Sequence, residues 1–240
     1  ADQAGTTNDP KLVVVHSAAV VGTELYSTSL FNDANLRAYY RLENVNDATA
    51  NTYNLTNNNS VTFSAGKFNN GAVGAATKSL NMASALGITS ASDTSYTLWV
   101  NLSSEITANF YQFLVHYRGT GHPLNMIRYD YNGGARRINF YSGNYTGSFQ
   151  YSLTMGTPVW YHFAMTRVGS TGEVRCYVNG VYQGGFTDTN TAPDAANFQL
   201  LGQDTANNVI GTMDDVAVFN RVLTAQEISN IYNGVTTPAD

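Results

Sequence analysis

Charged residues are scarce in this chain. They make up 12% of its 240 residues, about half of the usual share, and 12 Lys and Arg against 17 Asp and Glu leave a net charge of -5. A protein with so few basic residues lacks the positive surface that attracts nucleic acids and anionic membranes. Because 43% of the residues are hydrophobic, the low charge does not indicate disorder. We therefore expect a folded protein with no nucleic-acid partner.

Cysteine and long hydrophobic runs are also nearly missing. Cys176 is the one cysteine, so no disulfide can form within the chain and stability must come from a buried core. The longest apolar stretch, Leu12 to Val21, is interrupted by His16 and Ser17. It reaches about half of the roughly 20 residues that a membrane-spanning helix needs. The sequence therefore predicts no membrane insertion.

The polar residues that the chain does contain are mostly uncharged, with 27 Asn, 27 Thr and 17 Ser. This composition favours an exported protein at an extracellular or cell-surface location, and a virion component is the alternative. The first residue, Ala1, is compatible with cleavage of a signal peptide or with loss of an initiator methionine.

Hydrophobic periodicity indicates β-strands. A strand with one buried face alternates apolar and polar residues, whereas a helix repeats every three to four residues. Residues 36–43 place Ala38 and Tyr40 on one face. Tyr39 then lies on the opposite face, which a half-buried strand turns to solvent. The same alternation recurs in residues 96–102, 111–117 and 161–165.

Turn and capping signals support this interpretation. Asn179-Gly180 separates two apolar runs, and Asn-Gly supplies the positive φ angles of a two-residue hairpin turn. A second hairpin is predicted at residues 132–134. One helix is expected at residues 224–232, where Thr224 and Glu227 form a capping box.

Many short strands with one helix predict an all-β sandwich or barrel in a single domain, because 200 to 250 residues is an ordinary length for such folds. The predicted division is an N-terminal extension at residues 1–35, a sandwich at residues 36–234 and a tail at residues 235–240.

The order of the segments resembles the laminin G-like branch of the concanavalin A-like lectin/glucanase superfamily, in its bacterial or viral form. The resemblance implies an antiparallel jelly-roll of two sheets with one short C-terminal helix, which binds ligands on its loops or on a concave face. Ala50 and Thr52 stand where the family's opening turn usually has glycines. The segments that carry the resemblance are residues 36–43, 46–51, 96–100, 160–166, 174–180 and 211–228.

Enzymatic relatives of this fold need residues that the chain lacks. Glucanases of the superfamily carry two catalytic carboxylates in a Glu-x-Asp-x-x-Glu strand, and polysaccharide lyases carry an Arg-x-Glu strand with a Gln-x-His strand. Neither the Glu-x-Asp-x-x-Glu spacing nor a Gln-x-His pair occurs in the sequence, and its five Glu residues are scattered. We therefore predict a protein that is not an enzyme and has no catalytic residues.

Calcium is the metal that the resemblance suggests. In related sandwiches an ion can tie the opening turn to the closing strand, and Asp47, Asp214 and Asp215 match those positions. Neighbouring strand residues point in opposite directions, so we expect at most one of Asp214 and Asp215 at such a site. The alternative is that Asp47 forms an Asx turn and one Asp of the pair binds loop backbone. His162 and Cys176 are expected to be ordinary buried residues.

Aromatic and arginine side chains are densest between residues 111 and 145. Aromatic rings stack on sugar faces and guanidinium groups donate planar hydrogen bonds, so we predict a ligand site at Arg128, Tyr129, Tyr131 and Arg137. The alternative is core packing on one face of the strand and a solvated Arg/Asp face on the other.

The run from Leu12 to Val21 places apolar groups on both faces, which is typical of a strand buried on both sides. Two interpretations are open. The strand joins the sheet of its own sandwich, or it inserts into a neighbouring copy and builds a homo-oligomer or filament.

These observations predict a non-catalytic extracellular surface or appendage protein that recognises a glycan, a surface glycoprotein or another protein, and that self-assembles if its N-terminal strand is donated. The alternatives are a phage or virion structural or decoration protein and, further, a polysaccharide-active enzyme. Asn-x-Ser/Thr motifs at Asn54, Asn58, Asn101 and Asn144 are acceptors for N-glycosylation in a host that has the machinery.

Overall fold

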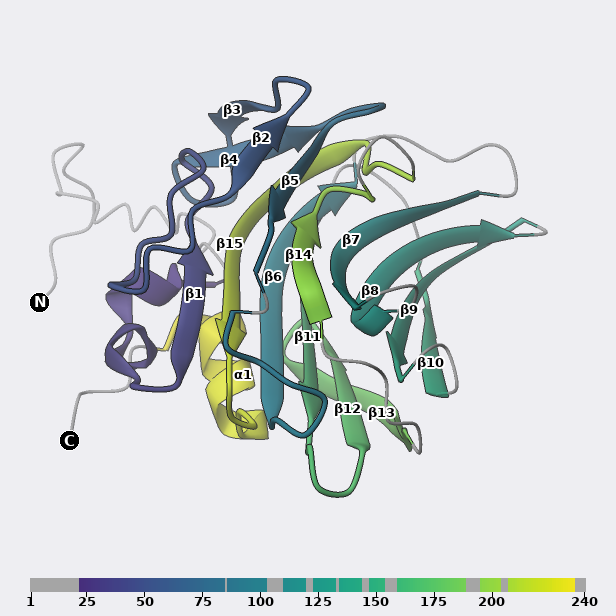
Figure 1. Cartoon of the computed structure of the whole chain (residues 1–240). Helices are drawn as coiled ribbons and strands as arrows, with labels where there is room; N and C mark the ends of the chain where they lie inside the picture. The colour runs from purple at the N-terminus through teal and green to yellow at the C-terminus, as the bar shows by residue number, and fades with distance from the viewer. Residues whose placement is uncertain are drawn as a thin grey trace, which may run out of the picture.

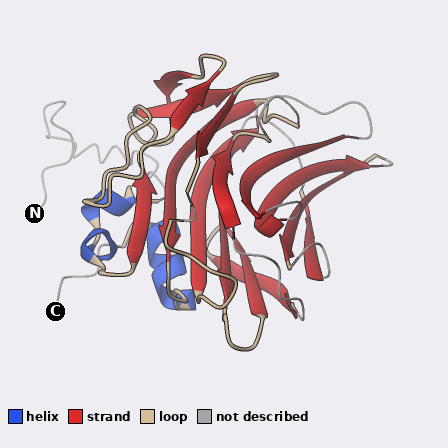
Figure 2. Cartoon of the chain, in the orientation of Figure 1, coloured by secondary structure: helices blue, strands red, loops and turns tan. Residues whose placement is uncertain are grey.

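The chain folds into two antiparallel β-sheets that face each other (Figure 1). The structure is a computed structural model that describes residues 22–84, 86–102, 110–119, 123–132, 134–143, 147–153, 159–188, 195–203 and 207–235. Strands dominate these residues, and short helical segments gather at one side (Figure 2). The predicted all-β jelly-roll sandwich with a C-terminal helix is confirmed.

Sheet A has the strand order β13-β12-β11-β6-β15-β4-β3, and β1 pairs with β15 outside this path. Its strands are β1 (Leu36–Tyr40), β3 (Thr62–Ala65), β4 (Asn70–Gly74), β6 (Thr94–Leu102), β11 (Trp160–Arg167), β12 (Glu173–Val178), β13 (Val181–Thr187) and β15 (Gly211–Phe219).

Sheet B has the order β10-β9-β8-β7-β14-β5-β2. Its strands are β2 (Thr56–Asn58), β5 (Ser79–Met82), β7 (Phe110–Gly119), β8 (Pro123–Asn132), β9 (Ala135–Ser142), β10 (Gly147–Ser152) and β14 (Ala195–Leu200).

The main core lies between the two sheets. Leu98 and Phe163 project into it from sheet A, and Ile127 and Phe140 project into it from sheet B. All four are at most 1% exposed. Because side chains alternate along a strand, the residues between these positions belong to the outer faces of the sheets, where the candidate sites lie.

Both predicted hairpins are present. Asn179 and Gly180 have φ angles of 51° and 75°, the positive values that the two-residue turn between β12 and β13 requires. The second hairpin brings Asn132 of β8 opposite Ala135 of β9.

A second core covers the outer face of sheet A. It joins the helix α1 (Ala225–Asn233) to the 3-10 helices η1 (Leu25–Ser27) and η2 (Ser29–Asn32). The predicted capping box at the start of α1 is confirmed, and Ile228 and Ile231 point into this second core.

Tyr39 is a correction to the sequence prediction. We expected its face of β1 to meet solvent, but Tyr39 is completely buried in the second core. The reason is that η1 and η2 fold back over β1, which alternation within a single strand cannot reveal.

Several predictions concern residues outside the described ranges. These are the donated or added strand at Leu12 to Val21, the glycosylation motif at Asn144 and most of the C-terminal tail. Among the described residues, no helix has the length and apolar character to cross a membrane.

The second core predicts a measurable stability contribution from α1. Ile228→Ala should lower the free energy of unfolding by about 2 to 5 kcal/mol, because it leaves a cavity at a fully buried position. Urea unfolding measures this change. Gln226→Ala, on the exposed face of the same helix, is the control and should change it by less than about 0.5 kcal/mol. An Ile228→Ala variant as stable as the control would show that α1 is not packed on the sheet.

Candidate functional site

The outer face of sheet B carries a cluster of polar and aromatic side chains on β7, β8 and β9. Arg128 and Asp130 alternate along β8 with core residues, so both project outward. The register pairs Arg128 with Asn139 and Asp130 with Arg137 on β9. Sheet pairing therefore brings four polar side chains from two strands together.

Arg128 is held in place from several sides. Its Nε and Nη2 donate to the two carboxylate oxygens of Asp130 at 2.6 and 2.7 Å, and Nη2 also donates to the Tyr141 hydroxyl at 2.8 Å. The guanidinium carbon lies 4.5 Å from the ring centre of Tyr111 and 4.7 Å from that of Tyr141. A bidentate ion pair combined with cation–π contacts fixes the orientation of an arginine.

Burial changes the electrostatics of this ion pair. The Arg128 and Asp130 side chains are only 15% and 18% exposed. Burial raises the pKa of Asp130 above its usual value, although the hydrogen bonds and charge of Arg128 and the charge of Arg137 act to lower it. The cluster is therefore partly desolvated, and its polar groups interact with a neighbouring molecule more strongly than they would in water.

Asn139 lies directly opposite Arg128 and is completely buried. Neither its amide nitrogen nor its amide oxygen has a hydrogen-bond partner. Leaving such a group unsatisfied costs about 1 to 3 kcal/mol, and natural proteins rarely do so away from water or ligand sites. Sequence reasoning missed Asn139, although its position between Ile138 and Phe140 places it on the Arg137 face.

The four predicted ligand residues divide between two faces. Arg128 and Arg137 lie on the outer face, next to Asp130. Tyr129 is fully buried in the main core, and Tyr131 is partly buried against the same core. The two tyrosines therefore do not join the arginines. The aromatic rings that accompany Arg128 belong to Tyr111 and Tyr141.

Asp47, one of the predicted calcium ligands, is held by protein donors. Its carboxylate accepts hydrogen bonds from the backbone nitrogens of Tyr39, Thr49 and Tyr53 and from the Thr49 hydroxyl, at 2.8 to 3.0 Å. The contact with Thr49, two residues ahead, is an Asx turn. The loop is thereby fastened to the outer edge of β1.

Asp214 and Asp215 lie on the same side of sheet A, which corrects the expectation that they point in opposite directions. The register of β15 against β6 shifts after Asp214, and Asp215 has a φ angle of 51°. Such a β-bulge changes the direction of a side chain. Asp214 accepts from the Phe68 backbone nitrogen at 2.8 Å, and Asp215 accepts from the Leu25 nitrogen and the Tyr39 hydroxyl.

Burial of the two carboxyl groups raises the pKa of Asp214 to about 8 and the pKa of Asp215 to about 7. In the described ranges, no three His, Cys, Asp or Glu side chains gather as metal ligands would. The hydrogen bonds of Asp47, Asp214 and Asp215 match the alternative of an Asx turn with loop-backbone contacts. Calcium binding itself stays a prediction.

His162 lies in a cross-strand row with Trp99 and Asp214 on the α1 side of sheet A. Its ring centre is 5.1 Å from that of Trp99 and 6.3 Å from that of Tyr232. The imidazole is fully buried, and neither ring nitrogen has a hydrogen-bond partner. Burial lowers its pKa to about 3, so His162 is neutral at ordinary pH.

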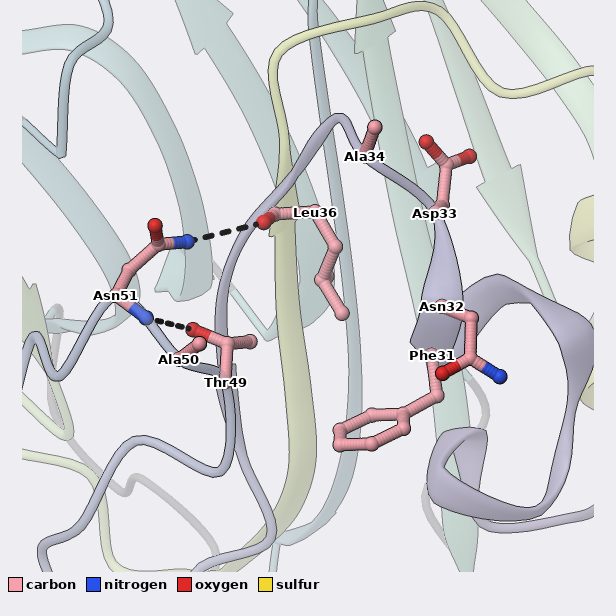
Figure 3. Close-up of a pocket in the computed structure, with 8 residues that line it drawn as sticks. All are labelled: Phe31, Asn32, Asp33, Ala34, Leu36, Thr49, Ala50 and Asn51. Atoms are coloured by element: carbon pink, nitrogen blue, oxygen red, sulfur yellow. Dashed lines mark hydrogen bonds between the residues drawn. The ribbon is translucent and has the colours of Figure 1, made fainter.

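A separate pocket opens beside the start of β1 (Figure 3). One wall comes from η2 and the residues after it, and the other comes from the loop that Asp47 holds. Its volume is about 330 Å³. The lining residues are Phe31, Asn32, Asp33, Ala34, Leu36, Thr49, Ala50 and Asn51.

A two-sheet sandwich with a preformed polar and aromatic cluster on one sheet belongs to the class of lectin-like domains. Sequence comparison identifies the family. A profile of the concanavalin A-like lectin/glucanases superfamily matches residues 74–229, and the chain belongs to this superfamily. Its fold is that of a carbohydrate- or protein-binding domain. No curated protein sequence matches the chain.

Solved structures share the fold at low sequence identity. Domain 4 of AbnA, an extracellular arabinanase from Geobacillus stearothermophilus, determined with arabinotriose, is 19% identical with a TM-score of 0.59, and the match covers 82% of this chain and 98% of that domain. The binding domain of Paraclostridial Mosquitocidal Protein 1 is 13% identical with a TM-score of 0.63, over 83% of this chain and 52% of that one.

A sialidase from Trypanosoma rangeli, in complex with the inhibitor DANA, is 17% identical with a TM-score of 0.64. That match covers 85% of this chain but 34% of the sialidase. The chain thus spans nearly all of the arabinanase domain, about half of the toxin binding domain and about a third of the sialidase. At these identities the likeness establishes the fold alone.

The hydrogen bonds of Asp47 lead to a prediction about metal removal. Asp47→Ala should lower the free energy of unfolding by about 2 to 4 kcal/mol, because backbone donors at a buried site lose a charged acceptor. If these hydrogen bonds replace an ion, excess EGTA should leave the melting temperature of the unsubstituted chain unchanged. A melting temperature that falls with EGTA and recovers with calcium would instead support the predicted ion.

The buried imidazole of His162 predicts a loss of stability in acid. The unfolded chain takes up a proton near pH 6.5, whereas folded His162 stays neutral down to about pH 3. The contribution of His162 to the free energy of unfolding is therefore fully present above pH 6.5. It falls by about 2 kcal/mol between pH 7 and pH 5. His162→Gln removes this component, so the difference in unfolding free energy between the two proteins should shrink by that amount. A pH-independent difference would contradict the burial of a neutral imidazole.

Proposed function

We propose that this protein is a non-catalytic extracellular recognition module that binds a glycan, free or on a surface glycoprotein, on the outer face of sheet B. The observation that carries this proposal is the arrangement around Arg128. A guanidinium is locked between two aromatic rings and stands opposite a buried amide that lacks hydrogen-bond partners. The site is thus built before any ligand arrives, which reduces the entropic cost of binding.

The chemistry of the cluster suits a saccharide. Tyr111 is 41% exposed and offers an aromatic surface of the kind on which an apolar sugar face packs. The arabinanase domain that this fold resembles was solved with arabinotriose, which supports a carbohydrate ligand for the same architecture.

The arrangement of charges supports binding without catalysis. Retaining and inverting glycosidases use two carboxyl groups on either side of the scissile bond. The described residues of β7 to β10 contain one carboxylate, Asp130, and both of its oxygens are engaged by Arg128. Self-assembly through Leu12 to Val21 stays a prediction beside this proposal.

The aromatic surface of Tyr111 gives the proposal its test. Tyr111→Ala should weaken glycan binding about tenfold or more while the melting temperature stays within a few degrees, because the ring is exposed. A glycan array that includes arabino-oligosaccharides identifies the ligand, and isothermal titration calorimetry measures the affinity. Arg128→Gln should have at least as large an effect.

Tyr182→Ala is the matched control, because Tyr182 is an exposed tyrosine of sheet A at 53% exposure. It should leave the affinity unchanged. The proposal fails if no glycan binds, or if the bound glycan is lost equally in the Tyr182 and Tyr111 variants.

A further inference from the structure

The pocket beside β1 is assembled from two segments that are rigidly held. On one side, Phe31 packs against Tyr39 with ring centres 5.9 Å apart, and Asp33 forms an ion pair with Arg221 at 2.6 Å. On the other side, the Asn51 amide donates to the backbone oxygens of Leu36 and Arg37 at 3.3 and 2.9 Å. The hollow between the walls is therefore preformed.

The lining of this pocket has an apolar and a polar part. Phe31, Leu36 and Ala50 supply carbon surface, and Asn32 and Asp33 place an amide and a carboxylate at the rim (Figure 3). A ligand that fits has one apolar face and hydroxyl groups along its edge. A sugar ring has this character.

Charge and size narrow the ligand class further. Asp33 is the one charged residue of the lining, and its partner Arg221 is shared with Glu227. This group of three carries a net negative charge, which disfavours anionic sugars. A volume of about 330 Å³ lies at the lower end for ligand pockets, so a neutral saccharide of one or two rings fits better than a longer segment.

We propose that the pocket between η2 and the Thr49–Asn51 loop binds a neutral sugar ring, with Phe31 against its apolar face, the Asn32 amide donating to or accepting from its hydroxyls, and the Asp33 carboxylate accepting from them. This site is separate from the Arg128 cluster. It lies beside β1, on the opposite side of the molecule from β8 and β9 (Figure 1). The inference shares the ligand class with the proposed function but uses different residues, so each can fail alone.

The test is a nuclear magnetic resonance titration of the full chain with arabinotriose and with neutral methyl pentosides and methyl hexosides. We expect saturable shifts of the Asn32 and Asn51 side-chain amides. Ala50→Phe fills the mouth of the pocket from an exposed position and should weaken these shifts at least tenfold. Phe31→Leu keeps the apolar volume but loses the ring, and it should weaken binding about three- to tenfold.

Ala76→Phe is the control, because Ala76 is likewise an exposed loop alanine. It should leave the pocket titration unchanged. The inference is overturned if no probe shifts the pocket amides, or if Ala50→Phe binds as the unsubstituted chain does.

Tyr111→Ala separates the two proposals. If the Asn32 and Asn51 amide resonances still shift on titration of this variant, the sugar binds in the pocket, whether or not the Arg128 cluster also binds glycan. Pocket shifts that disappear with Tyr111→Ala, while Ala50→Phe has no effect, assign all binding to the outer face of sheet B and overturn the inference.

Discussion

The central strands of sheet A are buried on both faces, and most of the remaining structure depends on this constraint. Its central strands β6 and β15 are buried along almost their whole length, with sheet B on one side and the second core on the other. A buried polar group on the outer face is stabilised when it finds a partner inside the protein. Asp214 and Asp215 do so by binding the backbone of two covering segments, which fastens the outer layer to the sheet.

Sheet B has a different role because its outer face is not covered by a helix of the described chain. Its edge strand β10 alternates buried and exposed residues, and its middle strands carry the Arg128 cluster. Arg128 is held there by its ion pair with Asp130 and by its contacts with the rings of Tyr111 and Tyr141. Sheet A is thus covered on both sides at its centre, whereas sheet B presents ordered polar groups on its outer face.

Much of the fold could be predicted from local patterns. The alternation in residues 96–102 and 161–165 places Leu98 and Phe163 in the core, and Asn179-Gly180 and Thr224 mark a turn and a helix start. These features depend on contacts within a few residues, or on the two-residue period of a strand. The same alternation places Arg128 and Tyr129 on opposite faces of β8, as the structure shows.

Other features depend on contacts between distant segments. Tyr39 is buried because residues 25–32 cover it, and the bulge at Asp215 arises from the pairing of β15 with β6 and β1. No periodicity within one strand contains this information.

The amino-acid sequence by itself determined the β-strands, the hairpins and the capped helix, because side-chain alternation, turn residues and capping residues act locally. The tertiary structure alone decided which face of each sheet is covered, where the two Asp carboxylates point and which rings enclose Arg128. Those properties follow from strand register and layer packing, which join residues of different strands and, for the two carboxylates, residues more than a hundred positions apart.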